Sequence, residues 1–116
     1  MDVFDGLNNK KIAVTGANGY IGAALVNALT KYSSQILCIS RRELKPIKNT
    51  LSLKADIRTN DCWPEIVERV DIIFHLAGNS GGIGYMGKNP ANVFYDNVMM
   101  DTQLLHVSKN ENIEKF

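Results

Sequence analysis

The sequence predicts an α/β fold in which a parallel sheet carries helices on both faces. Short apolar segments rich in β-branched residues alternate along the chain with segments whose apolar residues recur at helical spacing. Glycines join the first apolar segment directly to the first helical one. The alternation therefore indicates strand–helix–strand units with right-handed crossovers. The 116 residues suffice for one such domain around one hydrophobic core.

Four strands are expected, and the fold is expected to be truncated after them. Lys11 to Thr15 and Gln35 to Ser40 are apolar runs bounded by polar or turn residues, and Leu51 to Ala55 is a weaker third strand. Asp71 to Ala77 is apolar on both faces, which predicts burial within a parallel sheet. Its outer edge then needs cover from the C-terminal helix, from the last residues or from a second copy of the chain, which would form a homodimer.

Two helices are predicted between the strands. In Tyr20 to Lys31 the apolar residues fall at helical spacing. We expect its buried stripe to comprise Ile21, Ala24, Leu25, Ala28 and Leu29. The segment Asp61 to Val70 places Pro64 in a first helical turn, which tolerates proline.

The last third of the chain predicts a loop and a long helix. Asn79 to Gly87 is rich in glycine, so we expect no regular structure there but a loop long enough to be functional. Asn89 suits an N-cap and Pro90 a first helical residue. The apolar face of the helix that follows comprises Val93, Asn97, Met100, Leu104 and Val107.

Three glycines between the first strand and the first helix form a candidate phosphate-binding turn. Gly16 allows the tight turn, Gly19 leaves room for the phosphates, and Gly22 lets the helix pack closely on the strand. The alternative is a glycine-rich turn that binds nothing. The turn is not a Walker loop, because no Gly-Lys-Ser/Thr ends it. The candidate phosphate site comprises Gly16, Asn18, Gly19, Tyr20, Ile21 and Gly22.

The string TGANGYIG that contains these glycines resembles the opening signature of the extended short-chain dehydrogenase/reductase family. That family includes nucleotide-sugar epimerases, dehydratases and reductases. The strings GGIG at 81–84, Asn89-Pro90 and YDNVMM at 95–100 are most similar to the GDP-fucose synthase branch and its GDP-mannose epimerase relatives. The resemblance covers nearly the whole chain. It implies a Rossmann-type fold, hydride transfer through a nicotinamide cofactor, and a nucleotide-sugar substrate in the full enzyme.

The same resemblance implies further cofactor contacts. Asp56 and Ile57 match the position at which the family contacts the adenine ring, although Asp56 also suits an ordinary strand-end turn. The string HLAG at 75–78 is similar to the family's fourth-strand motif, which passes beside the cofactor, and its candidates are Leu76, Ala77 and Gly78. We assign no reaction role to His75. Asn97 matches the family's structural asparagine; the alternative is a solvent-facing side chain at the helix edge.

The end of the second strand favours NADP over NAD. A carboxylate at this position would bind the free ribose hydroxyls of NAD, whereas here the strand ends in Ser40, Arg41 and Arg42. A serine hydroxyl and arginine side chains can bind the additional phosphate of NADP. The alternative is that the two arginines belong to a solvated, charged loop.

No catalytic residue is assigned. The family uses a Tyr-x-x-x-Lys pair, and none of Tyr20, Tyr32, Tyr85 or Tyr95 has a lysine four positions later. We therefore expect residues 1–116 to be the N-terminal, NAD(P)-binding portion, with the catalytic and substrate-binding parts beyond Phe116, so that the chain alone has no turnover. Two alternatives stay open: a non-catalytic dinucleotide-binding or sensor module, and a scaffold that has lost the cofactor as well.

Composition argues against other classes. A net charge of +1 gives no basic field for nucleic acid. Cys38 and Cys62 lack the spacing of a metal or redox pair, so they are expected to be reduced thiols. The chain shows no leader sequence and no apolar run near the ~20 residues that span a bilayer. We expect no metal, no membrane association and a cytoplasmic location.

Overall fold

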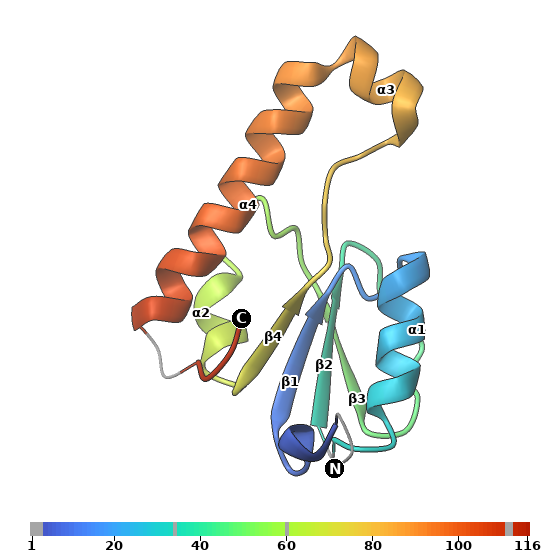
Figure 1. Ribbon diagram of the computed structural model, residues 1–116, viewed down its shortest axis with the longest axis vertical. Coiled ribbons are helices and arrows are strands. Elements are labelled where there is room, and N and C mark those ends of the chain that lie inside the picture. The colour runs from blue at the N-terminus through green and yellow to red at the C-terminus, as the bar shows by residue number, and fades with distance from the viewer. Residues whose placement is uncertain (1–3, 34, 60, 111–112) are drawn as a thin grey trace.

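The computed structural model describes residues 4–33, 35–59, 61–110 and 113–116 (Figure 1). After one short 3-10 turn, strands and helices alternate except that β3 follows β2 directly and α4 follows α3 directly. In chain order the elements are η1 (Asp5–Leu7), β1 (Lys11–Thr15), α1 (Tyr20–Leu29), β2 (Gln35–Ser40), β3 (Thr50–Lys54), α2 (Trp63–Val67), β4 (Ile72–His75), α3 (Gly82–Lys88) and α4 (Pro90–Asn110).

The four strands form one parallel sheet in the order β3-β2-β1-β4. Thr15, the last residue of β1, is level with Ile39 of β2 and His75 of β4, so the carboxyl ends of these strands lie along one rim. The chain order reverses at β1, because β2 lies on one side of it and β4 on the other. In sheets of this kind, ligands bind at the rim beside such a reversal. The predicted parallel α/β fold of the Rossmann type is confirmed.

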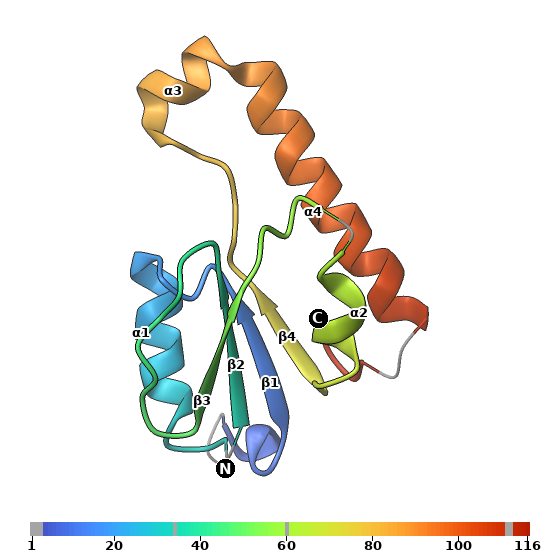
Figure 2. The ribbon, with the colours of Figure 1, turned by 180° about the vertical axis from the view of Figure 1, so that it is seen from behind.

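Helices cover both faces of the sheet, as predicted. Helix α1 packs on one face, and α2 and α4 lie on the other (Figures 1 and 2). Alternate residues of the strands point into two separate cores. On the α1 face, Ile12, Val14 and Ile36 pack with Val26 and Leu29 of the helix. The core on the opposite face includes Ala13, Leu37, Ile39, Trp63, Ile66, Ile73, Met100 and Leu104.

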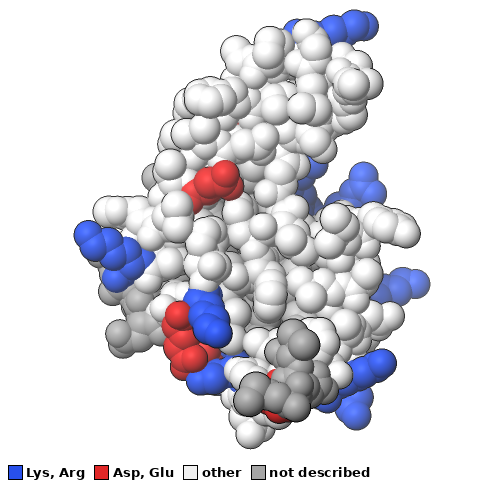
Figure 3. All heavy atoms as spheres, in the orientation of Figure 1, with Lys and Arg blue, Asp and Glu red and all other residues white. Residues whose placement is uncertain are grey.

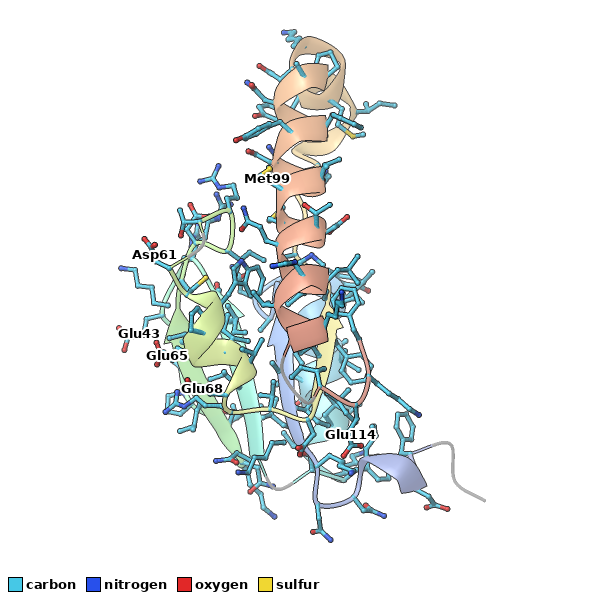
Figure 4. The ribbon with its side chains drawn as sticks, turned by 90° about the vertical axis from the view of Figure 1, so that its left-hand side faces the viewer. Glu43, Asp61, Glu65, Glu68, Met99 and Glu114 are labelled. Carbon is cyan, nitrogen blue, oxygen red and sulfur yellow. The ribbon has the colours of Figure 1, made fainter. Side chains whose placement is uncertain are left out.

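Helix α2 is held against α4 by its one tryptophan. Trp63 is buried, and its indole Nε1 donates to the Oε1 atom of Gln103 on α4 at 3.1 Å. The opposite side of α2 is charged, and Figure 4 shows Glu65 and Glu68 pointing away from α4. This amphipathic arrangement explains why so short a helix is stable, since its apolar face is covered on folding.

The buried face of α1 differs from the predicted stripe. Gly22, Val26 and Leu29 are its buried residues, whereas Ile21 is 68% exposed and Ala24 is also exposed. The expected stripe was therefore wrong in part. The helix is rotated because Gly22 must face the Gly16 turn, a tertiary contact that apolar periodicity does not reveal.

The glycine-rich segment forms a helix, contrary to the expectation of an irregular loop. Gly81 and Gly82 take positive φ angles of 54° and 79°, which glycine adopts without strain, and α3 runs from Gly82 to Lys88. The ring of Tyr85 packs on Gly81 so closely that an added Cβ would lie 2.4 Å from it. Helix α3 and the first turns of α4 extend beyond the rim of the sheet, and this part of the surface carries few charges (Figure 3).

The last residues cover the outer edge of β4. The Ile73 amide donates to the Lys115 carbonyl at 3.0 Å, and the Glu114 amide donates to the Asp71 carbonyl at 2.8 Å. Lys115 pairs with Ile72 in a parallel bridge. The sequence analysis considered the C-terminal helix, the last residues or a second copy of the chain as cover for this edge, and in the structure the last residues pair with it. An ion pair between Lys10 and Glu114 at 2.6 Å adds to this contact.

Candidate functional site

A cleft of about 390 Å³ opens at the rim formed by the strand ends. Three chain segments line it: the turn after β1, the ends of β2 and β3 with the residues that follow them, and the segment after β4. One residue of α3 and one of α4 complete the wall. The lining residues are Gly16, Asn18, Gly19, Ile39, Ser40, Arg41, Ala55, Asp56, Ile57, Arg58, Leu76, Ala77, Gly78, Asn79, Ser80, Gly81, Tyr85 and Met100.

The turn after β1 is tight at two of its glycines. Gly16 has a φ of +66°, and a Cβ there would lie 2.8 Å from the Ala77 nitrogen. A Cβ on Gly22 would lie only 2.1 Å from the Gly16 carbonyl oxygen. Gly19 is less crowded, at 3.2 Å from that oxygen, and its amide closes the turn by donating to it at 3.0 Å. Close packing of backbone on backbone therefore requires glycine at positions 16 and 22.

Unpaired amides lie at the start of α1. The first amide of the helix to find a carbonyl is that of Ala23, which donates to Gly19 at 2.9 Å. Within the part of the chain that the structure describes, the amides of Tyr20, Ile21 and Gly22 have no acceptor. No side chain caps this end, and Tyr20 is 97% exposed. Free amides and the positive end of the helix dipole together suit an anion such as a phosphate.

The end of β2 places a hydroxyl and one arginine at the cleft. Ser40 is buried, and its Oγ accepts the Arg42 amide at 3.1 Å, which leaves the hydroxyl hydrogen free to be donated. Arg41 lines the cleft, whereas Arg42 is exposed and is not among the lining residues. The structure thus brings Ser40 and Arg41 to the site, with Arg42 beside it.

Asp56 forms a two-pronged ion pair with Arg58. The guanidinium Nε lies 2.9 Å from Oδ1 and Nη2 lies 2.6 Å from Oδ2, while the Arg58 amide also donates to Oδ1 at 3.1 Å. These hydrogen bonds hold the pKa of Asp56 below its usual value despite partial desolvation, and Arg41 adds to the effect through its charge. The same contact raises the pKa of Arg58. Arg58 also approaches Asp96 of α4 at 3.5 Å.

Asn97 joins α4 to the segment after β4. Its Oδ1 accepts the Asn79 amide at 2.7 Å, and its Nδ2 donates to the Asn79 carbonyl at 3.0 Å. The Asn79 side chain in turn donates to Asp96 at 2.8 Å. Asn97 is half-buried and fully partnered, so it is not the solvent-facing side chain that the alternative described. It lies behind the lining of the cleft rather than in it.

Several residues of the cleft were not identified as site residues from the sequence: Ile39, Ala55, Arg58, Asn79, Ser80, Gly81, Tyr85 and Met100. A weak signal existed for the glycine-rich residues, which were expected to form a functional loop. Arg58 carried no signal of its own in the sequence. Tyr20, Ile21 and Gly22 belong to the turn and the first helical turn but do not line the cleft.

Two further expectations concern metals and membranes. Among the residues that the structure describes, no group of three or more histidine, cysteine, aspartate or glutamate side chains could hold a metal ion. No helix in the described ranges has both the length and the apolar character needed to cross a bilayer.

The strand order, the glycine turn and the cleft beside the chain reversal define a Rossmann-type fold. The sequence matches the NAD dependent epimerase/dehydratase family over residues 12–116, and the chain belongs to that family. This result confirms the resemblance found in the TGANGYIG string.

Individual proteins of known sequence or structure agree. GDP-mannose 3,5-epimerase 1 of Oryza sativa subsp. indica is 24% identical over 110 residues, which cover 91% of this chain and 29% of that protein. Epimerase Mth375 of Methanothermobacter thermautotrophicus superposes with a TM-score of 0.84 at 21% identity, covering 95% of this chain and 34% of that one. Bordetella bronchiseptica WbmF, solved in complex with NAD+, has a TM-score of 0.81 at 18% identity over 96% of this chain and 35% of its own. The chain thus spans about a third of the length of these proteins.

Proposed function

We propose that this chain is the NAD(P)-binding part of a nucleotide-sugar epimerase, dehydratase or reductase. One observation carries the proposal: the turn Gly16 to Gly22 leaves three amides unpaired at the start of α1, beside a cleft at the strand ends. A bound nicotinamide dinucleotide would supply hydride transfer. Family membership and the NAD+ complex of the WbmF fold relative support the choice of ligand.

Different residues in and beside the cleft would bind different parts of the cofactor. The glycine turn and the α1 amides would hold the pyrophosphate, and Asp56 with Ile57 would face the adenine. Leu76, Ala77 and Gly78 would line the path toward the nicotinamide, a segment that Asn97 supports through Asn79. A Cβ added at Gly19 would meet only the Gly16 carbonyl oxygen within 4 Å, so no side chain fills the space at this glycine, which supports the fit.

Isothermal titration of the chain with NADPH tests this proposal. Gly19→Asp would place a carboxylate at the phosphate position, and we expect it to abolish binding through repulsion and lost space. Asn27→Asp is the matched control, because it adds the same charge at an exposed position in the body of α1. Equal loss in both variants, or no binding by the wild-type chain, would contradict the proposal.

We further propose that NADPH binds more tightly than NADH. Arg41 faces the cleft, and the Ser40 hydroxyl has its hydrogen free for a phosphate oxygen. Arg41→Ala should weaken NADPH roughly tenfold, the effect of losing one charge-assisted hydrogen bond, and should leave NADH almost unchanged. Arg69→Ala, at an exposed arginine paired with Glu65, is the control. Equal affinity of the wild type for both cofactors would refute the preference.

A sugar nucleotide is the proposed substrate of the longer protein. The rice relative is named for GDP-mannose, which makes GDP-sugars the first ligands to test. The test is turnover of GDP-mannose and related GDP-sugars by a protein that contains this chain together with a Tyr-x-x-x-Lys pair. Cofactor binding without turnover of any sugar nucleotide would favour the non-catalytic, sensor-like alternative.

A further inference from the structure

Three polar side chains join β1, β4 and α4 next to the cleft. The Oγ1 atom of Thr15 lies 2.7 Å from Nδ1 of His75, and the Nε2 atom of the same ring lies 2.9 Å from Oδ1 of Asp101. Thr15 is fully buried, His75 is largely buried, and Asp101 is exposed. The series therefore runs from the sheet interior to the surface of α4.

Counting hydrogens at Thr15 fixes the direction of these bonds. Its Oγ1 accepts the amides of Leu76 and Ala77, both at 3.1 Å, so both lone pairs are used. The hydroxyl hydrogen then has one remaining neighbour, Nδ1 of His75, which must be an acceptor. A neutral ring with an unprotonated Nδ1 carries its hydrogen on Nε2, and that hydrogen points at the Asp101 carboxylate.

This arrangement is not catalytic, although a hydroxyl, an imidazole and a carboxylate in series are typical of activated nucleophiles. A nucleophilic oxygen needs a free lone pair and access to substrate. Thr15 has neither, because its lone pairs are engaged and no part of it is exposed. Its hydrogen bonds hold backbone instead.

The backbone that Thr15 holds is also the surface on which the glycine turn rests. A Cβ on Gly16 would meet the Ala77 nitrogen at 2.8 Å and the Leu76 carbonyl carbon at 2.9 Å, so the glycine turn and the segment after β4 are in direct contact. Leu76 and Ala77 themselves line the cleft. Any displacement of this segment would therefore shift the turn that is proposed to hold the pyrophosphate.

We infer that His75 is a positioning residue for the cofactor. In its Nε2–H form it accepts the Thr15 hydroxyl and so orients the Thr15 lone pairs toward the Leu76 and Ala77 amides. Asp101 stabilises that form of the ring. The link to the cofactor rests on the proposed function, whereas the role of His75 in holding the two amides does not.

Two substitutions separate positioning from simple packing. His75→Asn places an amide oxygen near the position of Nδ1 and keeps an acceptor for Thr15, whereas His75→Leu removes it. In His75→Leu we expect hydrogen exchange at the Leu76 and Ala77 amides to be about tenfold faster and NADPH to bind about tenfold more weakly, the loss of one hydrogen bond. His75→Asn should restore both to near the wild-type values. His106→Leu, at an exposed histidine of α4, is the matched control.

Exchange rates in His75→Leu equal to those of the wild type would overturn the inference, as would failure of His75→Asn to restore them. If His75→Leu does not fold, nitrogen NMR of the His75 ring in the wild-type chain still tests the inference, because it shows which ring nitrogen carries the hydrogen. A hydrogen found on Nδ1 instead of Nε2 would refute the assignment. A wild-type chain that fails to bind NADPH would remove the proposed function and the link to the cofactor, while exchange and tautomer would still report on the two amides.

Discussion

Replacing Gly22 by alanine tests the contact that shapes the phosphate turn. The new Cβ would lie 2.1 Å from the Gly16 carbonyl oxygen and 2.9 Å from its carbon, and both are backbone atoms that cannot rotate away. Helix α1 or the turn must then shift by about 1 Å. Overpacking of this kind costs about 1–3 kcal/mol. A contact of 2.1 Å with backbone places the cost near the upper end of that range. Alanine in a helix regains about 0.5–1 kcal/mol relative to glycine, so we expect a net loss near 2 kcal/mol.

Urea unfolding followed through the fluorescence of the buried Trp63 measures this loss. With a urea dependence of roughly 1–3 kcal/mol per molar, the midpoint should fall by about 1 M. Gly84→Ala is the matched control, because it makes the same change in α3, where an added Cβ meets nothing within 4 Å. It should leave the midpoint unchanged or raise it slightly. A Gly22→Ala midpoint equal to or above that of the wild type would refute the reasoning.

Three further predictions follow from the surrounding contacts. Arg58→Ala should raise the pKa of Asp56 toward its unfolded value of about 3.9, which carboxyl NMR can follow. Because the native pKa of Asp56 is lowered, the Asp56–Arg58 pair stabilises the fold above about pH 3.9, and this stabilisation is lost as the pH falls through the native pKa. For so exposed a pair the stabilisation is under about 1 kcal/mol. Burial raises the pKa of the Cys38 and Cys62 thiols, so both should react slowly with a disulfide reagent at neutral pH and rapidly in urea. Trp63→Ala should lower the free energy of unfolding by about 3–5 kcal/mol, measured by circular dichroism.

The strands and the glycine turn could be predicted because their causes are local. β1 and β2 occupy the predicted ranges, since each is an apolar run with turn residues beside it. The positive φ that favours glycine at position 16 follows from the turn itself, whereas the close approach of the Ala77 backbone to this glycine does not. The rotation of α1 could not be predicted from the spacing of apolar residues, because it depends on the close packing of Gly22 against the carbonyl of Gly16.

Contacts between distant segments account for the rest of what was missed. Arg58 reaches Asp96, and Asn79 reaches Asn97, only because the sheet order brings the segments after β3 and β4 beside α4. The helical state of 82–88 likewise depends on the ring of Tyr85 covering Gly81, a contact that glycine content alone argues against. Of these residues, Arg58, Asn79, Gly81 and Tyr85 line the cleft. The sequence therefore predicted the glycine turn and the strand ends of the site better than the residues that depend on contacts with α3 and α4.

Buried polar side chains at the strand ends explain how a rigid sheet determines the shape of a site made from turns. Thr15 and Ser40 end β1 and β2, and both hydroxyls accept backbone amides of the residues that follow a strand end. Burying a hydroxyl without a hydrogen-bond partner costs free energy, so the burial of Thr15 and Ser40 is favourable only when the segments that supply these amides are in place. The cost of losing the pairing couples the geometry of the turns to the stability of the sheet. Variants at Thr15 should therefore change the cleft without any direct contact with a ligand.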